Sequence, residues 1–183
     1  MPRIQPVTID QTDARTAAAL KAVQSKLGVL PNMFTTMAQA PAVLTGYLQL
    51  SEALSQGRLN ARQREMIAIA VAQENQCEYC LSAHAALGKG AGLNTGDIER
   101  ARGGLANDPT DAAMVRFALR VAKSRAAISD DDLALALARE AGLNDGQIME
   151  IVGQVALNIL TNYVNRVAGT EVDFPLLQLH SAA

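Results

Sequence analysis

The stretch REMIAIAVAQENQCEYCLSAH, residues 64–84, decides the fold that we predict for this sequence. Its first half contains an unbroken apolar run from Met66 to Ala72, which taken alone could also form a buried strand. The run continues a polar, helix-forming segment and includes three alanines, so a close-packed helix is favoured. Asn60 and Gln63 precede it with the spacing of a capping box, which predicts a helix from this point to about Glu74.

The rest of the chain also has the residue patterns of helices, with Gly and Pro at the expected breaks. Nothing in it resembles a hairpin or an alternation of strands and helices. The length of 183 residues is within the usual range of one domain. We therefore predict an all-α fold, a helical bundle formed as a single domain by residues 1–183. The other expected helices cover residues 10–27, 32–40, 41–56, 77–90, 94–102, 110–125, 130–141 and 145–167.

One short repeat is visible, GLNTGDI at residues 92–98 and GLNDGQI at residues 142–148. In the favoured interpretation both copies are helix boundaries: Gly ends one helix, Leu makes the apolar contact that follows, and Asn begins the next helix. A true duplication of a helical unit is the alternative. Neither interpretation assigns a function to the repeat.

The composition argues against several classes of partner. Aromatic residues make up 3% of the chain, Trp is absent, and the net charge is −2, so neither nucleic acid nor an acidic membrane is an expected partner. No apolar run approaches the ~18 residues of a membrane span, and the N-terminus lacks the apolar region of a signal peptide. We expect a cytoplasmic protein. Hydrophobic residues make up 49%, a surplus that could fill a large core or cover a subunit interface, and the simpler interpretation is a homo-oligomer.

Three side chains that suit redox chemistry follow the apolar run. Cys77, Cys80 and His84 are spaced by three and four residues, which places them on nearly the same face of a helix. A helix that begins near Cys77 contributes the partial positive charge of its N-terminus, which favours a thiolate. His84, one turn beyond Cys80, could accept a proton from that thiol or pair with its thiolate.

Other interpretations of these residues remain open at this point. Cys77, Cys80 and His84 could be ligands of a zinc ion. A closed site needs a fourth ligand, and the second histidine, His180, lies near the C-terminus; an open catalytic site with water as the fourth ligand stays possible. The cysteines could be apolar core residues, with His84 a hydrogen-bonded core histidine. They could also form a simple disulfide, although so short a loop contributes little stability.

Two further groups resemble sites but have simpler explanations. Asp130–Asp132 follow Ser129 at an expected helix start, where carboxylates stabilise the helix dipole, so a metal cluster is not predicted. Met33, Phe34 and Met37 could line a substrate pocket, but their helical spacing favours plain packing in the core or an interface.

The segment from residue 64 to residue 84 resembles the signature of the alkylhydroperoxidase D and carboxymuconolactone decarboxylase superfamily. That signature is a Glu, eleven intervening residues, a CxxC pair, three more residues and a His. Here Glu65 precedes Cys77 by twelve positions and His84 follows Cys80 by four, so every element is in register. The preceding GVLPNMF, residues 28–34, is similar to the peroxidase-related subgroup. The resemblance is clear over about residues 28–93, the expected redox core, and it implies the oligomeric all-α alkylhydroperoxidase D-like fold.

The resemblance also implies a catalytic set of Glu65, Cys77, Cys80 and His84. Cys80, nearest His84, would attack the peroxide and become a sulfenic acid, and Cys77 would then condense with it to a disulfide. Glu65 would orient and polarise His84 or a bridging water. The logic of thioredoxin-type sites instead nominates Cys77 as the attacking thiol, because it is closer to the helix N-terminus; we follow the family and expect Cys80.

We therefore expect a thiol-dependent peroxidase that acts on alkyl hydroperoxides. The cycle implied by the family uses no bound cofactor and no metal. It requires an external dithiol, of the lipoyl type or similar, to reopen the disulfide. The decarboxylase branch of the superfamily typically lacks the cysteine pair, so lactone decarboxylation is not expected.

The chain departs from the family pattern at one position. Peroxidase members often have a second His inside the CxxC pair, where this chain has Tyr79. A phenol with a pKa near 10 relays protons less readily at neutral pH. Either peroxidase activity is weak or the relay consists of Glu65 and His84 alone. Two alternatives follow: a thiol-disulfide oxidoreductase with little peroxidase activity, and a helical binding or assembly protein whose CxxC is vestigial or metal-bound.

Overall fold

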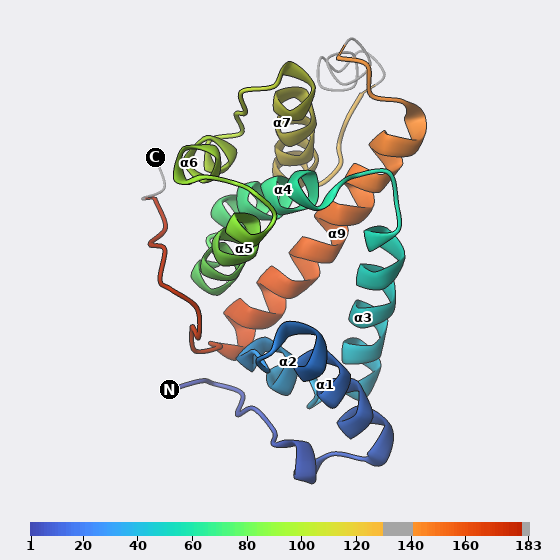
Figure 1. Ribbon diagram of the computed structural model, residues 1–183, viewed down its shortest axis with the longest axis vertical. Helices are drawn as coiled ribbons and strands as arrows, with labels where there is room; N and C mark the ends of the chain where they lie inside the picture. Colours follow the sequence, from blue (N-terminus) through green and yellow to red (C-terminus); the bar gives the residue numbers. More distant parts are fainter. Residues whose placement is uncertain (130–140, 181–183) are drawn as a thin grey trace.

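The computed structural model describes residues 1–129 and 141–180, which form helices and connecting segments with no β-strand (Figure 1). The predicted all-α fold is therefore confirmed for these residues. Most of the expected helix 130–141, together with Asp130–Asp132, lies outside them. The elements are the 3-10 helix η1 (Ile9–Gln11) and the α-helices α1 (Ala14–Leu27), α2 (Asn32–Met37), α3 (Pro41–Ser55), α4 (Ala61–Glu74), α5 (Glu78–Gly90), α6 (Thr95–Arg102), α7 (Pro109–Ser124) and α9 (Asp145–Ala168).

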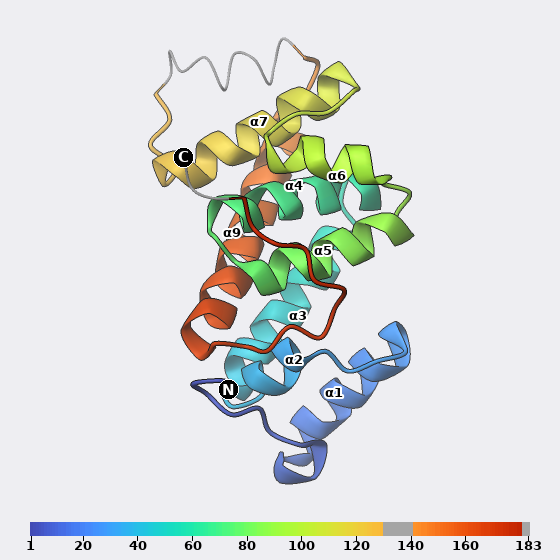
Figure 2. The ribbon, with the colours of Figure 1, turned by 90° about the vertical axis from the view of Figure 1, so that its left-hand side faces the viewer.

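Helix α4 is the centre of the fold. Every residue from Met66 to Ala72 is buried, because α4 packs against α5, α6, α7 and α9 (Figures 1 and 2). A helix enclosed on all sides needs no polar face, which explains why the run has no helical period in the sequence. The predicted capping box is present: the Asn60 side chain accepts from the Gln63 amide and the Gln63 side chain from the Asn60 amide.

The N-terminal helix begins later than the sequence suggests. A helix from residue 10 was expected, but Asp13 caps α1 by accepting hydrogen bonds from the amides of Arg15 and Thr16 at 2.9 and 3.0 Å. The expected start instead forms η1, which ends at Gln11, so the α-helix begins only after the Asp13 cap. The end of α1 is as expected, at Gly28 with a positive φ of 76°.

Both copies of the GLN motif lie at the start of a helix, as the favoured interpretation predicted. Asn94 caps α6 and Asn144 caps α9, each in a capping box with the residue three positions later. The preceding Gly92 and Gly142 both have positive φ, and the leucines between them and the caps are buried.

The chain after α9 runs as an extended segment across α2 and α5 (Figure 2). The Asp173 carboxylate accepts a hydrogen bond from the Asn32 amide at 2.7 Å, at the start of α2. The Leu177 amide donates to the Ser82 hydroxyl of α5 at 3.0 Å. These contacts hold the segment against α2 and against α5, the helix that begins at the cysteines. No helix in the described ranges is sufficiently long and apolar to cross a membrane.

Candidate active site

The two cysteines lie at the beginning of α5. Cys77 is the N-cap residue, and its sulfur accepts a hydrogen bond from the Cys80 amide at 3.3 Å. The two sulfurs are joined in a disulfide, and the residues are only 1% and 2% exposed. The three-residue spacing therefore brings the sulfurs together at the positive end of the helix, where a thiolate is stabilised after reduction.

His84 and Glu65 form a hydrogen-bonded pair one turn further along. His84 Nδ1 lies 2.8 Å from Glu65 Oε2, and both side chains are about one-fifth exposed. They come from α5 and α4, which pack directly against each other. The carboxylate accepts from Nδ1–H, and this selects the tautomer whose Nε2 carries the free lone pair. The structure thus brings together all four residues predicted from the sequence.

A cavity of about 460 Å³ opens beside this pair, and its wall includes Glu65, Cys80 and His84 but not Cys77. Most of the remaining wall is apolar and comes from α1, α2, α3, α9 and the C-terminal segment. Its apolar members include Val23, Leu27, Met33, Phe34, Leu48, Leu157 and Phe174.

The role expected of the α2 methionines and phenylalanine needs correction. Met33 and Phe34 are buried in the core, as predicted, but they also line the cavity, which the sequence argument did not favour. Met37 is a core residue that is not part of the cavity wall. Helical spacing identifies a buried face, but it does not distinguish a packed face from one that borders a cavity.

Tyr47 of α3 is a further polar residue on the cavity wall that the sequence did not indicate. Burial raises its pKa to about 12, with a contribution from the negative charge of Glu65, while a hydrogen bond with Ser51 acts in the opposite direction. The phenol is therefore neutral at physiological pH and can donate a hydrogen bond inside the cavity.

Asn165 is the second residue that sequence reasoning missed. Its side-chain amide donates to the Cys80 sulfur at 3.3 Å from the C-terminal end of α9, and the residue is 3% exposed. A donor aimed at a sulfur stabilises the thiolate form of that sulfur. Cys80 and Asn165 are 85 residues apart, so no local pattern predicts the contact.

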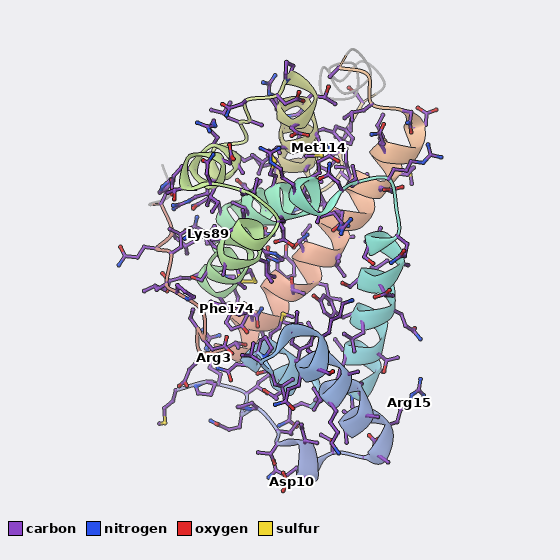
Figure 3. All side chains as sticks on the ribbon, viewed as in Figure 1. Arg3, Asp10, Arg15, Lys89, Met114 and Phe174 are labelled. Carbon is purple, nitrogen blue, oxygen red and sulfur yellow. A yellow bond between two sulfur atoms is a disulfide. The ribbon has the colours of Figure 1, made fainter. Side chains whose placement is uncertain are left out.

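Tyr79, the departure from the family pattern, has a structural contact. Its hydroxyl oxygen accepts a hydrogen bond from the Met33 amide at 3.1 Å, and its ring packs edge-on against Phe174, labelled near the start of α5 in Figure 3. Burial is the main cause that raises the pKa of Tyr79 above its ordinary value, so the side chain is a neutral phenol at physiological pH. It fixes α2 and the C-terminal segment to the start of α5.

We therefore expect Tyr79→Phe to lower the stability of the protein without slowing its reaction with peroxide. The Met33 amide would be left buried without its acceptor, which costs about 1–3 kcal/mol. Denaturant unfolding measures this loss, with the exposed Tyr163→Phe as the matched control. A rate of thiol oxidation by peroxide that falls more than tenfold in a folded Tyr79→Phe protein would contradict this and make the phenol part of the proton relay.

The zinc interpretation concerned the CxxC pair and the histidines. Cys77 and Cys80 are bonded to each other. Within residues 1–129 and 141–180, no three His, Cys, Asp or Glu side chains are grouped so that they could hold a metal ion. The second histidine, His180, lies on the C-terminal segment, where its Nε2 is 3.3 Å from Glu99 Oε2.

Comparison with known proteins gives matches to the sequence and to the fold. The sequence model of the carboxymuconolactone decarboxylase family matches residues 41–124. An uncharacterized protein of Haemophilus influenzae is 48% identical over 48 residues, a match that covers 26% of this chain and 42% of that protein. The chain thus spans less than half the length of this relative.

Solved structures match over nearly the whole chain. An alkylhydroperoxidase AhpD core structure, of an uncharacterized peroxidase-related protein from Ralstonia eutropha, is 26% identical with a TM-score of 0.85, covering 94% of this chain and 92% of that one. A peroxidase-related protein from a Silicibacter species is also 26% identical, with a TM-score of 0.76 and coverage of 93% and 91%. The debrominase Bmp8 is 16% identical with a TM-score of 0.78 and coverage of 93% and 91%, and shares the fold. Residues 41–124 thus match the carboxymuconolactone decarboxylase family, and nearly the whole chain has the fold of the alkylhydroperoxidase AhpD core and peroxidase-related structures.

Proposed function

We propose that this protein is a thiol peroxidase that reduces organic hydroperoxides with the Cys77–Cys80 pair. The observation that carries the proposal is the position of Cys80, on the wall of an apolar cavity that also contains the hydrogen-bonded pair of His84 and Glu65. A nucleophilic sulfur, a base oriented by a carboxylate and a binding cavity are the parts that peroxide reduction by a thiol needs.

In the first step the Cys80 thiolate attacks one oxygen of the peroxide, ROOH. The S–O bond forms as the O–O bond breaks, and the leaving alkoxide takes a proton and departs as the alcohol ROH. Cys80 becomes a sulfenic acid. His84, held by Glu65, accepts the proton of the Cys80 thiol and returns it to the leaving oxygen. The hydrogen bond from Asn165 stabilises the thiolate before attack.

In the second step Cys77 attacks the sulfur of the Cys80 sulfenic acid. The S–S bond forms, the S–O bond breaks, and the hydroxyl leaves as water with the proton of Cys77. The product is the disulfide present in the structure. The sum is ROOH plus two thiols giving ROH, water and one disulfide, and an external dithiol must return two electrons before the next cycle.

The cavity favours an organic hydroperoxide over hydrogen peroxide. Its size is within the range of small-molecule sites, and apolar side chains form most of its wall. An apolar substituent on the peroxide is removed from water on binding, which contributes roughly 25 cal/mol per Å² of buried apolar surface.

The proposal is tested by the rate of thiol oxidation in the reduced protein by cumene hydroperoxide and by hydrogen peroxide. We expect cumene hydroperoxide to react at least about tenfold faster, since burying part of its ring contributes a few kcal/mol. Leu157→Glu, which places a charge in the cavity wall, would lower the rate with cumene hydroperoxide more than the rate with hydrogen peroxide. Failure of both peroxides to oxidise the thiols would reject the peroxidase proposal.

A thiol-disulfide oxidoreductase is the second candidate, and Tyr79 is the observation that favours it. A neutral phenol that accepts the Met33 amide hydrogen bond replaces the histidine that peroxidases of this family often have at that place. In such an enzyme the site would exchange electrons with disulfides, and peroxide would react slowly. Reduced protein that is oxidised by lipoamide disulfide but not by either peroxide would support this candidate.

A further inference from the structure

The two cysteines of the disulfide line different pockets. Cys80 lines the apolar cavity with His84, whereas Cys77 lines a second pocket of about 640 Å³. This second pocket is formed by the N-terminal segment at Arg3, the start of α5, the C-terminal end of α9 and the residues that follow α9 up to Val172. In Figure 3, Arg3 is labelled beside that end of α9. The peroxide step described above uses only the first cavity.

The second pocket contains two buried polar atoms that lack a hydrogen-bond partner among the described residues. They are the carbonyl oxygen of the Asn165 side chain and the hydroxyl of Thr170, whose residues are 3% and 9% exposed. A buried polar atom without a partner costs free energy, so such atoms are uncommon in folded proteins. Asn165 and Thr170 line the same pocket as Cys77. The Thr170 hydroxyl can donate to an acceptor such as a carboxylate, and the Asn165 carbonyl oxygen can accept from the S–H of a thiol, so the pocket points to a ligand that carries both groups.

The charges around the pocket indicate the sign of this ligand. The Arg3 guanidinium donates to the carbonyls of Arg166 and Val167, each at 3.1 Å, and Arg166 donates to the Asn75 carbonyl at 3.0 Å. Neither guanidinium forms an ion pair within the described ranges. Glu78 is the one acidic residue of the pocket wall, so the two arginines leave a positive excess. The guanidinium fork matches the geometry of a carboxylate or a phosphate, and of these we take the carboxylate.

We propose that the second pocket binds the electron donor, a small dithiol that carries a carboxylate, and delivers it to Cys77. This proposal rests on the thiol cycle of the proposed function. It adds that the donor approaches the disulfide from the second pocket and attacks Cys77. The peroxide then reaches Cys80 through the apolar cavity, and the dithiol reaches Cys77 through the positively charged pocket.

The reduction step balances as two thiol-disulfide exchanges. A donor thiolate attacks the Cys77 sulfur, the bond between the two protein sulfurs breaks, and Cys80 leaves as a thiolate beside the Asn165 amide. The second thiol of the donor then attacks the donor sulfur of the mixed disulfide and releases Cys77. The donor ends as a cyclic disulfide, and its two protons end on the two protein thiols or in the solvent.

The test is the anaerobic rate at which the oxidised protein is reduced by dihydrolipoate, which has a carboxylate, and by dihydrolipoamide, which is neutral. At low ionic strength we expect dihydrolipoate to reduce the protein about fivefold faster than dihydrolipoamide does, because its carboxylate forms one partly exposed charge pair with the pocket. Arg166→Gln should remove this preference, whereas Arg15→Gln, the same change on α1 far from the pocket, should preserve it. Equal rates for both donors in the wild type, or an unchanged preference in Arg166→Gln, would overturn the proposal.

A second measurement covers the case in which Arg166→Gln is too unstable to study. In the Cys80→Ser protein only Cys77 can react, so its rate with the anionic dithiobis(nitrobenzoate) can be compared with its rate with neutral dithiodipyridine. We expect a preference for the anionic reagent that added salt abolishes, whereas a preference for the neutral one would contradict the proposal. Neither measurement involves peroxide, so a failed peroxidase assay and a failed donor site give different results.

Discussion

Replacing Cys80 by serine should abolish peroxide reduction, with kcat/KM for cumene hydroperoxide reduced on the order of a thousandfold or more, as for loss of a catalytic nucleophile. A serine hydroxyl is not ionised at neutral pH and is a far weaker nucleophile towards peroxide oxygen than a thiolate. The measurement is a steady-state assay with an excess of dithiol, together with circular dichroism to show that the variant is folded.

Cys77→Ser is the matched control for this prediction. Cys80 remains able to attack, so the variant should consume one equivalent of peroxide and stop as a sulfenic acid that a dimedone reagent can trap. The opposite pattern, with Cys77→Ser inert and Cys80→Ser still reactive, would show that Cys77 is the attacking thiol. That outcome would favour the thioredoxin-type assignment, which places the nucleophile nearest the helix N-terminus.

The second large effect on the rate is expected at His84, the proposed general base and acid. His84→Ala should lower the rate of thiol oxidation by peroxide roughly a hundredfold, the lower end of what general acid–base catalysis contributes. Glu65→Gln should cost less, about tenfold, because an amide can still hold the His84 ring at the position of the 2.8 Å hydrogen bond. Single-turnover oxidation of the reduced protein, followed across a pH range, separates these two effects.

His180→Ala is the control, because His180 pairs with Glu99 and does not line the cavity. Its rate should remain within about twofold of the wild type, as for a surface substitution away from the site. A His84→Ala protein that reacts as fast as the wild type at every pH would contradict the relay and leave the thiolate as the sole catalytic group.

The sequence was informative where chemistry is local. The spacing of Cys77, Cys80 and His84 predicts their shared helical face, and the capping box at Asn60 predicts where α4 begins. Glu65 could be identified only through the family signature, because its contact with His84 joins two helices. The start of α1 was placed too early, because several residues near it can act as caps and the choice depends on the backbone.

The surroundings of the site could not be predicted, because distant segments form them. Asn165 reaches Cys80 from α9, and Phe174 reaches Tyr79 and the cavity from the C-terminal segment. Their neighbours in the sequence carry no signal of these contacts. Cys77 and Cys80 line different pockets, and both pockets are formed by segments far apart in the sequence. Spacing alone therefore predicts a redox pair but not the two pockets beside it.

The most direct test of the account is a thiol count after the reduced protein meets one equivalent of cumene hydroperoxide in the absence of oxygen. We expect both thiols to be lost together, with one alcohol formed per protein, and peptide mapping to find the Cys77–Cys80 disulfide. If both thiols remain free while the peroxide is intact, the site does not reduce peroxides and the central claim is wrong.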